Sequence, residues 1–290
     1  MDMIIKKAVF PVAGFGTRFL PATKATPKEM LPIVDKPLIQ YAVEEAAKIG
    51  VEEFIFITHH AKASIQQHFM ENEMLHEMLI AQGKTELAQS IHKIGGSNAR
   101  YITVDQGEPK GLGHAIGCAK GLIDPDEFFV VILADDLIKT DGDNVLEQMV
   151  ESAKETNKQV LALEKVRESD ISKFGVVSPN RREGRISHLN GIVEKPKLED
   201  APSDLAVVGR YLFNQSIFNH INDIPGANNE IQITDAILRD IDNFIGYEFK
   251  GERFDCGSKV GYVKANVAYG LSNDELNGDL LDYFKDLKNL

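Results

Sequence analysis

The stretch KAVFPVAG, residues 7–14, decides the fold, because an apolar run that ends in glycine is typical of a buried strand. A helical pattern follows at 35–50, with Asp35 as the expected N-cap and Gly50 as the stop. The alternation continues with expected strands at 53–58, 100–106 and 128–136 and helical patterns at 61–93 and 112–122. Strands that alternate with helices favour a mainly parallel sheet that helices cover on both faces.

The second half of the chain has a different texture. Strand-like pieces follow one another at 159–166, 174–179, 185–196 and 205–214, and helices are expected at 216–224, 232–241 and 259–288. We therefore expect an α/β fold with a central mixed, mainly parallel sheet flanked by helices. The pieces extend one sheet, so we expect a single unit over 1–290 rather than two independent domains.

Composition and charge exclude several classes of protein. Of the 290 residues 43% are hydrophobic and 26% are charged, which is typical of a soluble globular chain and excludes global disorder. The 32 basic and 44 acidic residues give a net charge of −12, which disfavours binding to nucleic acid or to anionic membranes. Cys118 and Cys256 are too few for a disulfide framework or a zinc site. We expect a cytoplasmic protein.

The segment after the first expected strand carries cations. AGFGTRFLPATKATPK, residues 13–28, holds Arg18, Lys24 and Lys28 with no acidic residue, and its glycines let the backbone approach a phosphate. A mobile basic surface loop is the alternative. A Walker loop is absent, and Phe19 stands where the dinucleotide fingerprint needs its third glycine, which weakens a nicotinamide-dependent dehydrogenase.

The third expected strand ends in DQGEPKGLGHA, residues 105–115. The amide of Gln106 offers a donor beside an acceptor, which complements the adjacent ring N–H and carbonyl of uracil, thymine or guanine. The neighbouring glycines, Gly111 among them, would let a flat base lie against the backbone. A glycine-rich turn before a helix is an equally good interpretation of this segment alone.

Carboxylates follow two further strands. Asp135, in ILADD at 132–136, is the candidate Mg²⁺ ligand, because this cation prefers oxygen donors. Asp136 would lie on the opposite face if the strand alternation continues, and either carboxylate could instead cap the next helix. Asp255, in RFDCGS, is a second candidate.

VEKP, residues 193–196, places Glu194 and Lys195 at the end of an apolar segment. A carboxylate can accept hydrogen bonds from sugar hydroxyls and an ammonium can pair with a phosphate, although such a pair is most often solvated surface. His59, His60 and His114 are expected as surface, cap or packing residues. The chain shows no nucleophile and base pair, which fits nucleotidyl transfer, because a phosphate monoester with a second pKa of about 6 is already ionised.

These motifs together resemble a known family. GFGTRFLPATKATPKEMLPIVDKPLIQY at 14–41 resembles the opening of sugar-1-phosphate nucleotidylyltransferases. QGEPKGLGHA, VEKP, AVVGRY, NEIQITDAI, DCGSKVGY and ANVAYGL then follow in the order seen in bacterial UTP–glucose-1-phosphate uridylyltransferases. The resemblance covers about Lys7 to Leu271. Ala134 departs from it, since the family usually has proline there.

The resemblance implies a Rossmann-like nucleotidyltransferase fold, with a nucleotide-binding half at about 1–140, a sugar-phosphate half at about 141–255 and C-terminal helices at about 256–290. It implies that UTP and glucose 1-phosphate give UDP-glucose and pyrophosphate with Mg²⁺, in a homodimer or homotetramer. The implied site residues are Ala13, Gly14, Gln106 and Gly111 at the nucleotide, Arg18 and Lys28 at the triphosphate, Asp135 and Asp255 at the metal, Gly175, Glu194 and Gly209 at the sugar, and Lys195 at its phosphate. A glucose-1-phosphate thymidylyltransferase and a non-catalytic sugar-nucleotide sensor are the alternatives.

Overall fold

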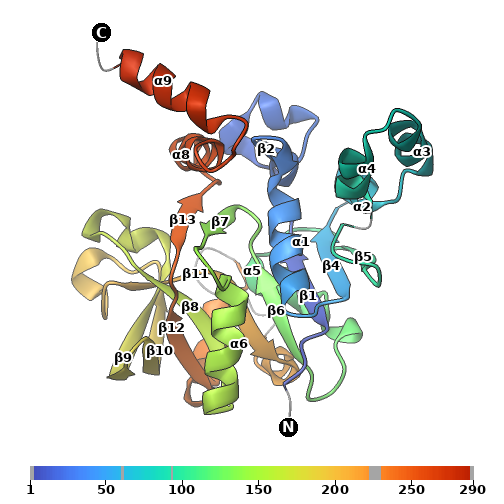
Figure 1. Ribbon diagram of the computed structural model, residues 1–290. Helices are drawn as coiled ribbons and strands as arrows, with labels where there is room; N and C mark the ends of the chain where they lie inside the picture. The colour runs from blue at the N-terminus through green and yellow to red at the C-terminus, as the bar shows by residue number, and fades with distance from the viewer. Residues whose placement is uncertain (1–2, 60–61, 93, 222–229, 288–290) are drawn as a thin grey trace.

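A nine-stranded mixed sheet forms the centre of the computed structural model, which describes residues 3–59, 62–92, 94–221 and 230–287 (Figure 1). Its strand order is β5-β4-β1-β6-β11-β8-β12-β10-β9. The strands are β1 (Lys7–Pro11), β4 (Glu53–Thr58), β5 (Arg100–Asp105), β6 (Phe128–Ile132), β8 (Gln159–Lys165), β9 (Gly175–Glu183), β10 (Ile186–Glu194), β11 (Leu205–Asn214) and β12 (Phe244–Glu248). Two short ribbons accompany it, β2 (Pro32–Ile33) with β3 (Lys36–Pro37) and β7 (Asp136–Lys139) with β13 (Glu252–Asp255).

The first four strands of this order pair in parallel, as β8 and β12 do further along the sheet. β1 pairs in parallel with β4 and β6, and β4 pairs in parallel with β5. β11 enters antiparallel between β6 and β8, so the later strands continue the same sheet. The expected α/β class with a central mixed sheet is confirmed.

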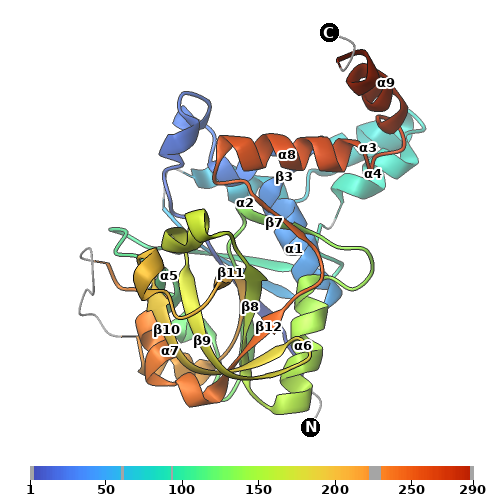
Figure 2. The same ribbon diagram turned by 90° about the vertical axis from the view of Figure 1, so that its left-hand side faces the viewer.

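Helices cover both faces of the sheet. The α-helices of the described residues are α1 (Leu38–Lys48), α2 (Ala63–Phe69), α3 (Glu73–Ala81), α4 (Thr85–Ile91), α5 (Leu112–Gly117), α6 (Val145–Thr156), α7 (Ile233–Arg239), α8 (Lys259–Gly270) and α9 (Asn277–Leu287). Figure 2 places α5 and α7 on one side of the sheet and α1 and α6 on the other.

The apolar core is divided between these two faces by the alternation of each strand. Along β1, Ala8 and Phe10 face the cluster under α1 and α6, whereas Val9 faces the cluster under α5 and α7. All three side chains are fully buried. Burial of a side chain such as that of Phe10 stabilises the fold by roughly 1.5–3 kcal/mol, so both helical layers are held by the hydrophobic effect.

Two expected boundaries were wrong. The helix expected at 35–50 begins at Leu38 with Pro37 as its N-cap, and Asp35 is not the cap. The residue before a proline disfavours the helical region, and Lys36 and Pro37 pair instead with β2. The strand expected at 128–136 ends at Ile132, where a turn with a bond from Asp136 N to Leu133 O precedes β7.

Other segments are shorter than expected. The helical pattern at 216–224 begins as a 3-10 turn over Gln215–Asn219, and residues 222–224 lie outside the described residues, as does residue 288 of the pattern at 259–288. That last pattern divides into α8 and α9. A third apolar cluster, with Leu137, Phe254 and Ala265, packs α8 against β7 and β13 and so places the C-terminal helices beside the strand ends.

Candidate active site

The basic loop at 14–28 follows β1 and is held by its own hydrogen bonds. Gly16 adopts a left-handed conformation with φ of 62°, and its carbonyl accepts a hydrogen bond of 2.8 Å from Thr23 Oγ1. The ring of Phe19 meets the ring of Tyr262 on α8 edge-on at 5.5 Å. Phe19 therefore anchors the loop against α8, while Arg18 and Lys24 remain exposed at the surface.

A buried ion pair lies beneath this loop. Lys62 Nζ donates to Glu29 Oε2 at 2.8 Å and to the carbonyl of Val12 at 2.5 Å. Both side chains are buried, and burial lowers the pKa of Lys62 and raises that of Glu29 against their mutual attraction. Lys62 therefore links Glu29, the residue next to Lys28, to Val12 just after the end of β1.

Four of the expected charged residues converge at one point beside Gly257. A Cβ atom built on Gly257 would lie 3.0 Å from Asp135 Oδ2, 3.0 Å from Asp255 Oδ1 and 3.7 Å from Arg18 Nη1. Lys28 Nζ donates to Asp135 Oδ2 at 2.5 Å. The elements that carry these groups are far apart in the sequence, and the carboxyl end of β6, the end of β13 and the basic loop meet here.

The two carboxylates fit Mg²⁺. The glycine at 257 leaves a space between their oxygens that a side chain would fill, and the donors are the hard oxygens that this cation prefers. Among the described residues no group of three or more His, Cys, Asp or Glu side chains is placed to hold a metal ion. Mg²⁺ commonly takes one or two protein carboxylates and completes its shell with water and substrate phosphate, so a pair of carboxylates is within its usual range.

Electrostatics keep the pair of Lys28 and Asp135 charged. Burial alone would raise the pKa of Asp135, but the ammonium of Lys28 and the guanidinium of Arg18 bring it below its usual value. Burial likewise opposes the charge on Lys28, and the carboxylate of Asp135 raises the pKa of that lysine above its usual value. Both groups are therefore ionised near neutral pH.

A cavity of about 590 Å³ opens beside these charges. Its walls include Arg18, Asp135 and Asp255, and also Gly175, Glu194, Lys195 and Gly209 from the second half of the chain. Lys195 Nζ lies 3.1 Å from Glu194 Oε1, and Lys195 has a left-handed φ of 45°. The adjacent Glu–Lys pair thus lines the cavity, with the side chain of Lys195 still 47% exposed.

Two glycines in the wall of this cavity pack closely against neighbouring side chains. A Cβ on Gly175 would lie 2.9 Å from Thr234 Cγ2, and one on Gly209 would lie 2.7 Å from Leu133 Cβ. Both distances are shorter than a normal van der Waals contact. The close packing at these positions requires glycine.

The expectation for Asp136 was wrong. The strand ends before Asp135, so alternation does not apply, and Asp135 and Asp136 both line the cavity. Asp136 Oδ1 accepts from Arg253 Nη1 at 2.5 Å, and Asp136 Oδ2 accepts from Gly209 N at 2.9 Å. Burial raises the pKa of Asp136, the guanidinium of Arg253 lowers it, Asp135 raises it again, and the net shift is upward.

Arg253 is a residue that the sequence reasoning missed. Its Nε donates to Glu164 Oε2 at 2.6 Å and its guanidinium lies 5.0 Å from the ring of Phe174. Asp255 offered the signal, because residues two apart on a strand share a face, and Arg253 therefore lies on the same side of β13. Tyr211, Lys173 and Thr234 also line the cavity and were not singled out.

The residues expected at the base lie to one side of this cavity. Ala13 and Gly14 follow β1, and Gln106 and Gly111 follow β5, which lies on the other side of β4. None of these four lines the 590 Å³ cavity, although Leu112, next to Gly111, does. Gln106 Nε2 lies 3.1 Å from Nδ1 of His114, a histidine that the sequence had suggested only for surface, cap or packing roles. His60 lies outside the described residues.

The cysteines do not supply a nucleophile. Burial, with nearby carboxylates, raises the pKa of Cys256 to about 12, and burial also raises that of Cys118. Both thiols therefore stay protonated near neutral pH.

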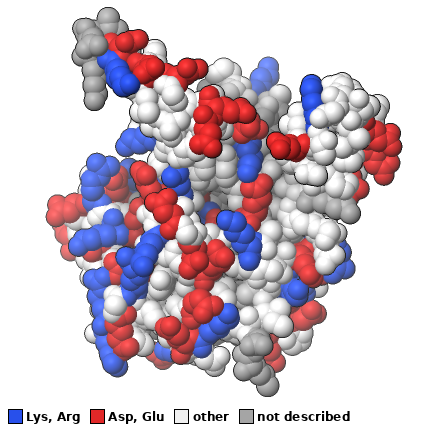
Figure 3. Space-filling view, viewed as in Figure 1, with Lys and Arg blue, Asp and Glu red and all other residues white. Residues whose placement is uncertain are grey.

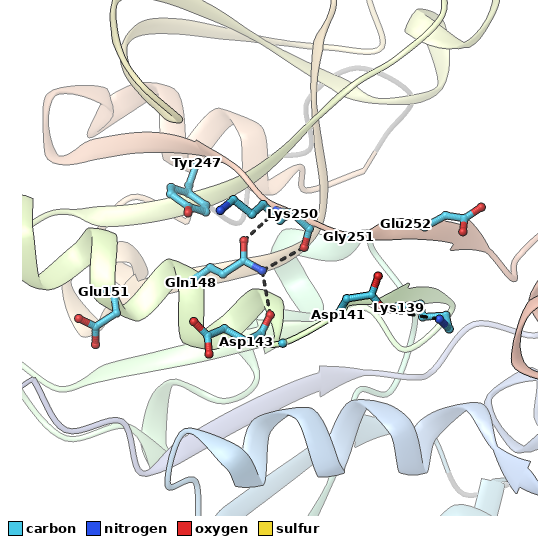
Figure 4. A pocket seen from close by; sticks show the side chains of 10 residues that line it. Lys139, Asp141, Asp143, Gln148, Glu151, Tyr247, Lys250, Gly251 and Glu252 are labelled. Carbon is cyan, nitrogen blue, oxygen red and sulfur yellow. Dashed lines mark hydrogen bonds and ion pairs between the residues drawn. The ribbon is translucent and has the colours of Figure 1, made fainter. Parts of the chain in front are cut away.

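A second cavity, of about 690 Å³, lies between the start of α6 and the turn from β12 to β13 (Figure 4). Gln148 Nε2 donates to the carbonyls of Asp143 and Lys250, and Gln148 Oε1 accepts from Lys250 N. The polar groups of Gln148 are thus engaged in bridging the loops around it. Charged side chains of both signs line this cavity, and no pair of its carboxylates converges as Asp135 and Asp255 do.

Charge is mixed on the face of the molecule that Figure 3 shows. Figure 3 shows Lys and Arg side chains interspersed with Asp and Glu on the face in view, without a broad basic area. An anionic ligand would therefore be held by the local cations of the cavity. Within the part of the chain that the structure describes, no helix combines the length and the apolar character needed to cross a bilayer.

Known proteins resemble this chain over almost its whole length. The nucleotidyl transferase family model matches residues 7–271. The UTP–glucose-1-phosphate uridylyltransferase 2 of Staphylococcus saprophyticus is 44% identical over 287 residues, which are 98% of each chain.

Solved structures agree with this. A UTP-bound UGPase from Acinetobacter baumannii is 40% identical, with a TM-score of 0.89, over 98% of this chain and 100% of that one. A UDP-glucose pyrophosphorylase complexed with UDP-glucose is 44% identical, with a TM-score of 0.84, over 93% of this chain and 100% of that one. With its strand-end charges, its two-carboxylate point and these relatives, the chain belongs to the nucleotidyl transferase family, as its resemblance to the sugar-1-phosphate nucleotidylyltransferases implied.

Proposed function

We propose that this protein transfers the uridylyl group of UTP to glucose 1-phosphate, giving UDP-glucose and pyrophosphate. The observation that carries the proposal is the convergence of Arg18, Lys28, Asp135 and Asp255 at the mouth of the 590 Å³ cavity. Two carboxylates and two cations at one point match a polyphosphate that arrives with a divalent cation. The identity of the two substrates, UTP and glucose 1-phosphate, is inferred from the names of the relatives.

Asp135 and Asp255 would hold Mg²⁺, which when bound supplies positive charge against the triphosphate. Arg18 and Lys28 bind the phosphates on the other side and offset the charge that the departing pyrophosphate gains. An oxygen of the sugar phosphate attacks the α-phosphorus, and the bond from that phosphorus to the oxygen shared with the β-phosphate breaks. The attacking oxygen is already ionised near neutral pH, so the residues of the site position and neutralise, and none has to remove a proton.

The second half of the site would hold the sugar phosphate. Lys195 pairs with its phosphate as a point charge, and Glu194 accepts hydrogen bonds from sugar hydroxyls. Gly175 and Gly209 would shape the wall of the sugar site, since both line the cavity. The ion pair of Glu194 with Lys195 holds both groups at the wall before the sugar arrives.

The nucleoside would lie across the ends of β1 and β5. Ala13 and Gly14 contact it through the backbone, and Gln106 with Gly111 reads the base. Gln106 is suited to this, because only 7% of its surface is exposed and its backbone N–H is fixed by the carbonyl of Thr58 at 2.8 Å. Its amide complements the N–H and carbonyl edge of uracil.

The proposal also includes the organisation of the whole chain, its oligomeric state and its location. Residues 1–290 act as one nucleotidyltransferase unit, with a nucleotide half at about 1–140, a sugar-phosphate half at about 141–255 and C-terminal helices from about 256. We propose a homodimer or homotetramer, for which the exposed apolar side chains of Leu281, Tyr283 and Leu287 on the projecting α9 give support (Figure 1). A cytoplasmic location agrees with the two free thiols, Cys118 and Cys256.

Pyrophosphate release across a grid of nucleoside triphosphates and sugar phosphates tests the proposal. We expect the highest kcat/KM for UTP with glucose 1-phosphate and no turnover in EDTA. A preference for dTTP would favour the thymidylyltransferase, and binding of UDP-glucose without turnover would favour the sensor. Full activity in EDTA would contradict the metal site, and quenching or enhancement of NADH fluorescence would reopen the dehydrogenase.

A further inference from the structure

The amide of Gln106 can present either of two hydrogen-bonding patterns to a base. Rotation by 180° about its last bond exchanges the carbonyl oxygen and the NH₂ group. One orientation complements the N–H and carbonyl of uracil, and the other complements the ring nitrogen and amino group of cytosine. A glutamine alone therefore does not separate the two bases, and something else must fix the amide.

The structure provides such a contact. Gln106 Nε2 lies 3.1 Å from Nδ1 of His114, which is eight residues further along the chain, on α5. With the amide nitrogen facing the ring, Nδ1 of His114 accepts this hydrogen bond in the tautomer that carries its hydrogen on Nε2. The amide oxygen and the second N–H hydrogen of Gln106 stay available to a ligand.

The backbone that carries His114 is fixed independently of any ligand. Gly113 N donates to the carbonyl of Ile231 at 2.8 Å, and a Cβ on Gly113 would lie 2.8 Å from that same oxygen. Gly111 has a φ of 104°, and a Cβ there would lie 2.7 Å from the carbonyl of Ile231. These close approaches hold the start of α5 against the segment around Ile231, so the imidazole is brought to Gln106 by backbone packing.

We propose that His114 is a positioning residue that determines base specificity by holding the amide of Gln106 with its oxygen toward the base. The inference rests on the proposed function and deepens it, since it concerns which triphosphate that site accepts. The fixed amide accepts from the ring N–H of uracil and donates to the adjacent carbonyl. Cytosine would bring its unprotonated ring nitrogen against the amide oxygen, and reversal of the amide would bring that oxygen against Nδ1 of His114.

Three variants of nearly equal shape test this. His114→Asp keeps a group that only accepts, His114→Asn offers either an acceptor or a donor, and His114→Leu offers neither. The measurement is the ratio of kcat/KM for UTP to that for CTP. We expect this ratio to fall roughly 3- to 10-fold in His114→Leu, which is the effect of losing one ordinary hydrogen bond. The ratio in His114→Asp should stay near the wild-type value, and the ratio in His114→Asn should lie between those of the other two variants.

Thymine supplies an internal control. It has the same N–H and carbonyl edge as uracil, so the ratio of UTP to dTTP should stay constant in all three variants. A change in that ratio together with the CTP ratio would mean that the pocket had been reshaped, which contradicts a role in orienting the amide. A double variant gives a second control, because His114→Leu should have no effect on base preference once Gln106→Ala has removed the amide.

The outcomes separate the inference from the proposed function. An unchanged UTP/CTP ratio in His114→Leu, with UTP still used, overturns the inference and leaves the proposed function intact. If His114→Leu does not fold, equal ratios in the Asp and Asn variants overturn it as well. A wild-type protein that does not turn over UTP contradicts the proposed function itself.

Discussion

The negative charge of Asp135, rather than the size of its side chain, should determine its contribution to catalysis. It pairs with Lys28 at 2.5 Å and faces Asp255 across the space at Gly257. Asp135→Asn keeps the shape and removes the charge, so we expect kcat to fall at least ~100-fold, as for removal of one preorganised electrostatic contact. The measurement is steady-state pyrophosphate release at saturating UTP and glucose 1-phosphate.

Asp141→Asn is the matched control, because Asp141 is fully exposed beside the other cavity and should leave kcat unchanged. Thermal unfolding of both variants checks that the fold is retained. An Asp135→Asn variant with wild-type kcat would place the metal elsewhere.

Lys195 should act on one substrate only. Loss of a charged hydrogen bond costs roughly 1.5–3 kcal/mol, so in Lys195→Ala we expect kcat/KM for glucose 1-phosphate to fall ~10–150-fold. Binding of UTP without sugar, followed by calorimetry, should barely change. Lys197→Ala, on an exposed side chain nearby, is the control. An equal loss of UTP affinity would show that Lys195 lies at the nucleotide.

Single residues were predictable where their chemistry was local. The basic loop and Asp135 could be selected because the carboxyl ends of parallel strands meet at one edge of a sheet. Asp255 instead ends β13, which belongs to the separate ribbon with β7. Arg253 and His114 could not be weighed in the same way. The contact of Arg253 with Asp136 depends on where β6 ends, and the contact of His114 with Gln106 depends on how α5 packs. Neither of these features is determined by a single residue.

Gly261 sets how closely α8 approaches the end of β13. A Cβ at this position would lie 2.0 Å from the carbonyl oxygen of Asp255, and backbone cannot yield as a flexible side chain does. Gly261→Ala should therefore displace Asp255, lower the stability by about 1–3 kcal/mol and raise the Mg²⁺ concentration needed for half-maximal activity. Chemical denaturation and an Mg²⁺ titration of activity measure the two effects.

The control for this change is Gly278→Ala on α9, where a Cβ meets no atom within 4 Å. It should leave the Mg²⁺ titration unchanged and stabilise the helix by up to ~1 kcal/mol. Normal Mg²⁺ dependence in Gly261→Ala would show that Asp255 is not a metal ligand.

Element types were easier to predict from the sequence than their ends. β4 has the bounds of its pattern, EFIFIT, because all its apolar side chains are buried by the sheet. The start of α1 was misplaced because Pro37, not Asp35, precedes the first helical residue. The segment at 128–136 looked like one strand because the apolar run FFVVILA extends to residue 134, although a turn begins at Leu133.

Across the whole molecule, one buried ion pair joins the two halves. Arg210 on β11 is 1% exposed, its Nη2 donates to Glu45 on α1 at 2.8 Å, and its Nη1 donates to the carbonyl of Leu133 at 3.2 Å. Arg210→Met leaves Glu45 without its partner, so we expect a loss of roughly 3–5 kcal/mol in the free energy of unfolding. Urea denaturation measures it.

The double variant Arg210→Met, Glu45→Met removes both charges and should recover most of this loss, since apolar replacements of a whole buried pair are often neutral. A single variant as stable as wild type would mean that the pair does not hold the halves together.

The order of strands could not be predicted. The sequence indicated a mixed sheet, but the placement of β11 between β6 and β8 depends on pairings between segments far apart in the chain. β11 is buried along almost its whole length, and its apolar pattern alone would suit any interior position.

The central position of β11 also affects how the protein folds while it is being synthesised. During synthesis β1, β4, β5 and β6 emerge first and can pair with one another, but the far edge of β6 stays open until Leu205–Asn214 has left the ribosome. That edge carries the apolar side chains of Val130 and Ile132, and unpaired apolar edges invite association with other chains. A chain that stops before β11 therefore leaves the edge of β6 unpaired and apolar. Fragments that contain only the first half of the chain should aggregate when they are produced alone.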